Sequence, residues 1–181
     1  MRRALAAAAA LSGMLLACGY HFTAGGGPLP GEARALYVPV FKNLTAEPGI
    51  EGVFTDAFRQ ELSRWGREGG EASDAVAEGE IKSVASTGAI FTNTFSDAGV
   101  QIAATAAYRL QATLVLRVLR AGEKIAETTV TGTEDYLPSR AELGQTGQGT
   151  AVLEAEANRR LALRRLAATL TRQAYQNLTG F

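Results

Sequence analysis

The chain has 181 residues with 18 basic and 18 acidic side chains, so its formal net charge is zero. A neutral chain lacks the basic footprint of a nucleic-acid-binding protein, and one cysteine with one histidine forms neither an internal disulfide nor a four-ligand zinc site. The hydrophobic share of 46% suffices for a folded core, and the length fits one domain.

The first 17 residues have the pattern of a secretory signal. Met1-Arg2-Arg3 precedes an apolar run that ends at Ala17, which is shorter than the roughly 20 residues of a membrane-spanning helix. The stretch Leu15-Leu16-Ala17-Cys18 resembles the bacterial lipoprotein signal, in which the cysteine becomes the first mature residue and carries acyl groups. We therefore expect a signal peptide over residues 1–17, with N-acyl and S-diacylglycerol groups on Cys18. A buried N-terminal helix and an unmodified thiol are the alternatives.

Lipidation of Cys18 predicts where the protein resides. Two or three acyl chains hold a protein on a membrane far more firmly than one. Gly19 follows the cysteine, and in the best-known sorting rule an aspartate at that position retains a lipoprotein in the inner membrane. We therefore expect a lipid-anchored protein of the outer membrane that faces the periplasm.

The mature chain begins with a tether and a short strand. Residues 18–34 contain three consecutive glycines and two prolines, which is typical of a flexible linker, so residues 35–181 form the predicted single domain. Leu36–Phe41 has the composition of a strand. Because Pro39 has no N–H group, we expect an edge strand or a non-pairing position for Pro39.

A helix and a strand follow. Apolar residues recur at helical spacing from Ile50 to Trp65, and the stripe of Phe54, Phe58 and Trp65 indicates either packing against a sheet or a ligand groove. Gly66, Gly69 and Gly70 end this predicted helix. Residues 74–87 alternate as a strand does, and residues 88–99 favour a turn that exposes Phe91 and Phe95.

The second half predicts two more strands and a helix. Residues 101–121 and 125–136 read as strands joined by the hairpin signal Ala121-Gly122-Glu123-Lys124. A polar loop over residues 138–149 precedes a helix over residues 149–177. Arg159 falls within the apolar arc of this helix and is expected to extend towards solvent or to pair with a buried carboxylate. The polar side is either a solvated face or a contact for an anion or a partner, and it carries Arg160, Arg164, Arg165 and Arg172.

This order predicts an α+β fold in which two helices pack on one face of a four-stranded mixed sheet. The other face is expected to be wet or covered by a partner.

Catalytic signals are weak. His21 is the only histidine and lies in the predicted tether, where a general base would lack a rigid scaffold. No GxSxG, HExxH, P-loop or CxxC motif is present. Glu78 and Glu80 share one face of a strand, which indicates a wet sheet face or a carboxylate pair. We expect no enzymatic activity, no metal and no cofactor.

Several local features together resemble the LptE family of outer-membrane lipoproteins. They are Cys18-Gly19-Tyr20-His21-Phe22, the strand Leu36–Phe41 with Asn43 after it, Glu47-Pro48-Gly49-Ile50-Glu51, Asp74–Ile81 and Ala89–Asn93. The resemblance implies an LptE-like sandwich that plugs the β-barrel LptD, supports its assembly and assists lipopolysaccharide insertion into the outer leaflet. It also implies binding of lipopolysaccharide itself.

The resemblance suggests site residues. Contact with the barrel is expected at Phe91, Thr92, Asn93 and Phe95. Residues 90–100 contain no lysine or arginine, although phosphate binding needs basic groups, so contact with lipopolysaccharide is expected at Arg109, Arg117 and Lys124. The alternatives are another envelope lipoprotein, which binds a peptidoglycan synthase or a secretion assembly, and a periplasmic hydrolase.

Overall fold

The structure of the chain is a computed structural model that describes residues 27–95, 99, 101–137 and 148–180. The predicted signal peptide, Cys18 and the loop over residues 138–147 lie outside the described residues. In chain order the elements are η1 (Pro30–Glu32), β1 (Leu36–Tyr37), β2 (Lys42–Asn43), α2 (Ile50–Arg64), β3 (Glu68–Gly69), β4 (Ala75–Phe95), β5 (Gln101–Arg120), β6 (Glu123–Tyr136) and α3 (Gln148–Thr179).

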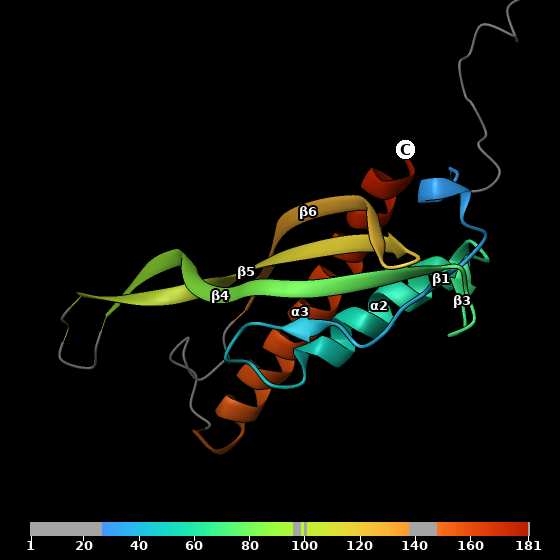
Figure 1. Cartoon of the computed structure of the whole chain (residues 1–181). Coiled ribbons are helices and arrows are strands. Elements are labelled where there is room, and N and C mark those ends of the chain that lie inside the picture. Colours follow the sequence, from blue (N-terminus) through green and yellow to red (C-terminus); the bar gives the residue numbers. More distant parts are fainter. Residues whose placement is uncertain (1–26, 96–98, 100, 138–147, 181) are drawn as a thin grey trace, which may run out of the picture.

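All strands join one mixed sheet in the order β3-β1-β4-β5-β6, and β2 also pairs with β4. The short strands β1, β2 and β3 pair in parallel, whereas β4, β5 and β6 form an antiparallel meander. Figure 1 shows this meander as the long axis of the molecule, with α3 passing behind the sheet. The predicted α+β class with two helices and a mixed sheet is confirmed, although the sheet has six strands instead of four.

Apolar residues at every second position of the strands place the hydrophobic core on one face of the sheet. On β5 the side chains of Leu110, Leu114 and Leu116 are fully buried, and successive residues of a strand point to opposite faces. They join a single hydrophobic cluster that includes Phe54 and Phe58 of α2 and Leu166 and Leu170 of α3. The predicted apolar faces of both helices therefore lie against the sheet.

The predicted strand Leu36–Phe41 is shortened to β1, Leu36–Tyr37, and β2 begins after it at Lys42. Val38–Phe41 pairs with no strand, so Pro39 has a non-pairing position, as expected. The segment is fixed by α2 instead, because the N–H of Phe41 donates to Thr55 Oγ1 at 2.9 Å and Arg59 Nη2 donates to the Val38 carbonyl at 2.6 Å. The ring of Phe41 covers Gly79 of β4, where an added Cβ would lie 2.4 Å from the ring atoms.

The helix end and the hairpin follow the sequence signals. Gly66 has a φ of +64°, and the N–H groups of Gly66 and Arg67 donate to the carbonyls of Ser63 and Leu62, which is the Schellman pattern. The hairpin between β5 and β6 turns at Ala121 and Gly122, both with positive φ, as a type I′ turn requires.

The turn expected over residues 88–99 is wrong in its position, because β4 continues to Phe95. It pairs with β5 as far as Phe95 opposite Gln101, with register shifts at Gly88/Ile90 and Ile90/Phe91. Strand β6 ends at Tyr136 opposite Tyr108, so beyond this point the hairpin is a two-stranded ribbon that projects from the body (Figure 1).

Candidate interaction surface

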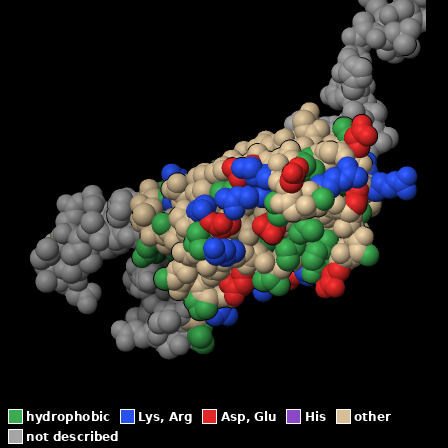
Figure 2. All heavy atoms as spheres, viewed as in Figure 1, with side chains coloured by type: hydrophobic (Ala, Val, Ile, Leu, Met, Phe, Trp, Pro, Cys, Tyr) green, Lys and Arg blue, Asp and Glu red, His purple; other side chains and the backbone are tan. Residues whose placement is uncertain are grey.

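The face of the sheet opposite the helices is polar. Its side chains come from alternate positions of β4, β5 and β6, which the antiparallel register brings into rows across the sheet. One row joins Glu78, Arg117 and Glu127, and another joins Thr87, Arg109 and Asp135. Figure 2 shows charged side chains of both signs interspersed on the viewed face, without a field of one sign.

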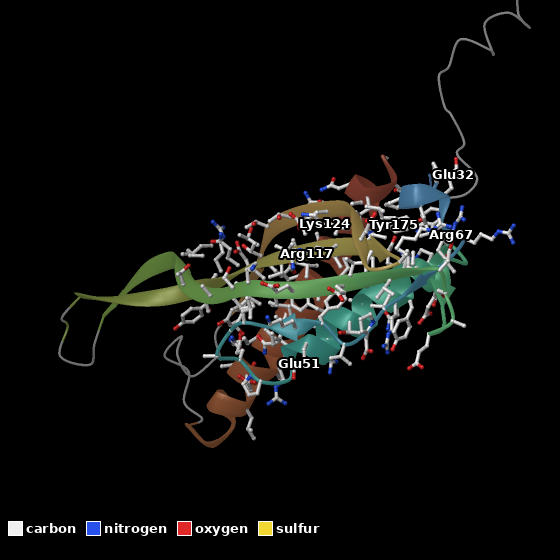
Figure 3. The ribbon with its side chains drawn as sticks, viewed as in Figure 1. Glu32, Glu51, Arg67, Arg117, Lys124 and Tyr175 are labelled. Atoms are coloured by element: carbon white, nitrogen blue, oxygen red, sulfur yellow. The ribbon has the colours of Figure 1, made fainter. Side chains whose placement is uncertain are left out.

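An ion-pair network lies near the middle of this face. Arg117 binds Glu127 Oε2 through Nε at 2.7 Å and Glu80 Oε2 through Nη1 at 3.2 Å. Lys82 binds Glu80, and Lys124 binds Glu127 at 3.2 Å. Figure 3 labels Arg117 and Lys124, which belong to the adjoining strands β5 and β6.

The network favours the ionised carboxylates. Hydrogen bonds from Lys82 first, and then from Arg117, lower the pKa of Glu80 below its ordinary value. For Glu127 the hydrogen bond from Arg117 is the largest cause of a lowered pKa, and Lys124 adds to it. Neither carboxyl is therefore set up as a proton donor near neutral pH. Glu78 is exposed, whereas the Glu80 side chain is only 12% exposed within its ion pairs.

A second ion pair lies where the ribbon leaves the body. Arg109 donates through Nε and Nη2 to the two oxygens of Asp135 at 2.8 and 2.9 Å, a bidentate geometry of high specificity. This contact lowers the pKa of Asp135 below its usual range.

All three basic residues expected to contact lipopolysaccharide therefore have carboxylate partners within the sheet. Arg109 pairs with Asp135, while Arg117 and Lys124 share Glu127. A phosphate would have to compete with these carboxylates. The expected contact at these residues stays a prediction.

The expected barrel contacts lie at the far end of β4. Phe91, Thr92, Asn93 and Phe95 belong to this strand and pair with residues 101–105 of β5. They occupy a projecting ribbon instead of the loop tip that the sequence indicated, and the exposure of their side chains lies outside what the structure describes.

A cavity that the sequence did not indicate lies between the root of the ribbon and α3. Its volume is about 410 Å³. Its apolar wall includes Ile90, Leu137 and Leu161, which are about half exposed or more. Arg165 also lines the cavity and lies 3.8 Å from Glu134. The sequence did not indicate this cavity because Ile90, Leu137 and Leu161 come from β4, the segment after β6 and α3.

The basic side of α3 is exposed, and most of its arginines have partners. Arg160 binds Glu156 at 2.7 Å, and Arg172 lies 3.8 Å from Glu61. Arg159, placed within the apolar arc, is half-buried and pairs with Glu47, a carboxylate that is itself only half-buried at 27% exposed, instead of the buried partner expected. Among the residues that the structure describes, no ion pair is seen for Arg164.

The turn before α2 explains part of the sequence pattern around Asn43. Asn43 Nδ2 donates to the Glu47 carbonyl at 2.6 Å and to Glu51 Oε2 at 3.0 Å. Glu51 also accepts from the N–H of Gly49. Its own backbone is the largest cause of its lowered pKa, followed by Asn43. Asn43, Gly49 and Glu51 thus have a structural role in fixing the start of the helix.

Within the described ranges, no group of three or more histidine, cysteine, aspartate or glutamate side chains could hold a metal ion. In the same part of the chain, no helix is both long and apolar enough to span a membrane.

Comparison with known proteins identifies the family. The sequence model of LptE, described as lipopolysaccharide-assembly, matches residues 33–178. No protein among those with curated functions matches the chain. Among solved structures, a putative lipoprotein from Caulobacter crescentus is 14% identical with a TM-score of 0.48, over 78% of this chain and 88% of that one. The rare lipoprotein B from Shewanella oneidensis is 14% identical with a TM-score of 0.47, over 80% of this chain and 94% of that one. Because the family model covers most of its length, the chain belongs to the LptE lipopolysaccharide-assembly family.

Proposed function

We propose that this chain is a non-enzymatic outer-membrane lipoprotein, anchored through Cys18, that fills the lumen of an LptD-like β-barrel and assists lipopolysaccharide insertion into the outer leaflet. The observation that carries the proposal is the family match over residues 33–178. The Leu15-Leu16-Ala17-Cys18 stretch supports the anchor.

The exposed sheet face suits a body placed in a polar lumen. Its charges neutralise one another in short networks, as around Arg117 and Arg109. Such a surface carries no strong single-sign field and can stay hydrated beside polar barrel walls. Contact with the barrel is assigned to the ribbon end at Phe91, Thr92, Asn93 and Phe95.

The first experiment tests the partner. Affinity purification from native outer membranes is expected to recover a β-barrel protein, and depletion of the chain is expected to reduce surface lipopolysaccharide. The double variant Phe91→Ala/Phe95→Ala should recover less barrel, whereas Val40→Ala, at a side chain 65% exposed, serves as the control. Unchanged surface lipopolysaccharide after depletion, with no barrel recovered, would contradict the proposal.

A lipid A contact fits the cavity beside α3 better than the sheet face, because its arginine, Arg165, makes only a long contact of 3.8 Å with Glu134, whereas the basic residues of the sheet face make ion pairs of 2.7–3.2 Å. Acyl chains need apolar walls, which Ile90, Leu137 and Leu161 supply, and a phosphate needs a guanidinium at the rim, which Arg165 supplies. The charge reversal Arg165→Glu should weaken binding of purified lipopolysaccharide. Arg164→Glu makes the same charge change at the neighbouring exposed position outside this cavity and should bind as wild type does. Equal loss in both variants would indicate a general charge effect.

A further inference from the structure

The sheet has a long open edge on β4. Parallel pairing on this side ends with Asn43 opposite Ile81, and the last backbone contact is the Leu44 N–H donating to the Ile81 carbonyl at 3.0 Å. Beyond it, no strand of the described chain pairs with this side of β4. We call the stretch Ser83–Ile90 on this side the β4 edge.

The β4 edge presents hydrogen-bonding groups. In a strand of L-residues, side chains that share a face belong to residues whose N–H and C=O groups share an edge. Ile81 points into the core and its carbonyl faces the β2 side. Val84 and Ser86 pair with the core positions Ala112 and Leu110, so after the register shift they direct their N–H and C=O groups to the same side.

The two outer edges of the sheet differ in charge. Natural proteins protect edge strands with charged residues and proline. The other open edge, β6, has such protection from Glu123, Lys124, Glu127, Glu134 and Asp135. From Ser83 to Phe95, β4 has neither a charged residue nor a proline. One edge of this sheet thus has charged residues that protect it, whereas the other lacks charge protection.

The local geometry leaves room for an added strand. Register shifts occur at Ile81/Ser83 and Gly88/Ile90, and between them the pairing with β5 runs without a break from Ser83 to Gly88. Ser83, Ala85 and Thr87 on the polar face are exposed and small. The regular, uncharged segment between the two register shifts offers an exposed edge to an incoming strand.

We propose that the β4 edge binds an extended, uncharged segment of the partner barrel's polypeptide as an additional strand of the sheet. The inference rests on the proposed function, because a domain that fills a barrel lumen has the barrel chain as its neighbour and leaves no room for a second copy. Main-chain hydrogen bonds to Val84 and Ser86 provide the binding, and the absence of charge on the edge selects an uncharged partner segment.

A matched pair of variants tests the edge. Ala85, Gln111 and Thr133 form one row across the sheet, with Ala85 on β4 and Thr133 on β6. Ala85→Lys places a charge on the unprotected edge, and Thr133→Lys places the same charge on the protected edge. Ala85→Lys is expected to lower barrel recovery from native membranes about tenfold, a loss that corresponds to removal of a few strand contacts, and Thr133→Lys is expected to recover barrel as wild type does.

Hydrogen exchange of the wild-type complex supplies a readout that needs no variant. The amide hydrogens of Val84 and Ser86 should exchange more slowly in the barrel complex than in the isolated chain, while the β6 residues Thr129–Thr133 exchange alike in both. Barrel recovery without this protection would overturn the strand addition and leave the proposed function standing. Failure to recover any barrel would instead contradict the proposed function. Protection of Val84 and Ser86 in the isolated chain that rises with its concentration would show a second copy on the edge and would also overturn the proposal.

Discussion

The contact between Phe41 and Gly79 connects the segment between β1 and β2 to the centre of the sheet. The ring lies where a Cβ of residue 79 would be, and the Phe41 N–H donates to Thr55 of α2. One residue thus joins β4 to α2 across the core, in a place where no larger side chain than glycine fits on the strand.

Substitution of this glycine should reduce stability. Gly79→Ala places a methyl group 2.4 Å from ring atoms in a packed core, and overpacking of this kind costs about 1–3 kcal/mol. The free energy of unfolding in urea measures the change. Gly52→Ala is the control, because it lies within α2 with no heavy atom within 4 Å of the added Cβ, and alanine there should stabilise the helix by up to about 1 kcal/mol. Wild-type stability in Gly79→Ala would show that the ring does not lie against the strand.

Side-chain partners were the least predictable feature at the residue scale. The sequence indicated a wet face at Glu78 and Glu80, and it singled out Arg109, Arg117 and Lys124 as basic groups on strands. It could not indicate that these three are paired, because their carboxylates lie on neighbouring strands and the pairing depends on registers such as Arg109 opposite Asp135. For Arg159 the sequence indicated either extension towards solvent or a carboxylate partner, and the structure shows the partner, Glu47.

At the scale of elements, the stability of the antiparallel meander is expected to decrease at acidic pH. The pKa values of Glu80, Glu127 and Asp135 are lowered in the folded chain by their basic partners. A lowered folded pKa contributes stability that is present above the unfolded pKa, close to 4.5 for glutamate and 3.8 for aspartate, and that is lost as pH falls through the folded value. Stability should therefore decrease below about pH 4.5.

Urea unfolding at pH 7 and pH 3.5 measures this dependence. The triple variant Glu80→Gln/Glu127→Gln/Asp135→Asn lacks the three carboxyls and should show a smaller decrease than wild type. An identical decrease in both proteins would assign the acid sensitivity to other groups.

The last helix should show two energetically distinct faces. Leu166 is 1% exposed and belongs to the core cluster, whereas Leu161 is 47% exposed beside the cavity. Leu166→Ala is expected to cost about 2–5 kcal/mol through lost burial and a residual void. Leu161→Ala should change the free energy of unfolding by less than about 1 kcal/mol, and similar losses in both would place Leu161 in the core.

The sequence predicted secondary-structure elements well where the repeat of apolar residues spans several turns or strand positions. The helices α2 and α3 and the strands β5 and β6 cover several periods, so their ranges were close to those observed. The strands β1, β2 and β3 have two residues each and no measurable period. The distal part of β4 was taken for a turn because Gly88, Asn93 and Gly99 are turn-forming types, although cross-strand pairing with β5 keeps this segment extended.

At the scale of the whole molecule, the anchor should be separable from the fold. Cys18 precedes the described domain, whose core begins at Leu29, inside the stretch 18–34 that the sequence predicts to be a tether. Cys18→Ala is therefore expected to leave circular dichroism and thermal unfolding of the purified domain unchanged while the protein leaves the membrane fraction. Cys18→Ser is a near-isosteric control that should be released equally. An unchanged membrane fraction in both variants would refute lipidation of this residue.

The two ends of the β4–β5 hairpin lie far apart along the sheet. At one end, Arg120 Nη1 donates to the Gly31 carbonyl at 2.6 Å and Arg120 pairs with Ala75 at the start of β4, so the N-terminal segment adjoins this end. Phe95 lies at the other end of the 21-residue strand, which at about 3.3 Å per residue reaches up to about 70 Å. This reach exceeds twice the roughly 30 Å hydrocarbon thickness of a bilayer. With its N-terminus anchored at the periplasmic leaflet as proposed, the chain has in β4 a strand long enough to place its far end at the opposite leaflet.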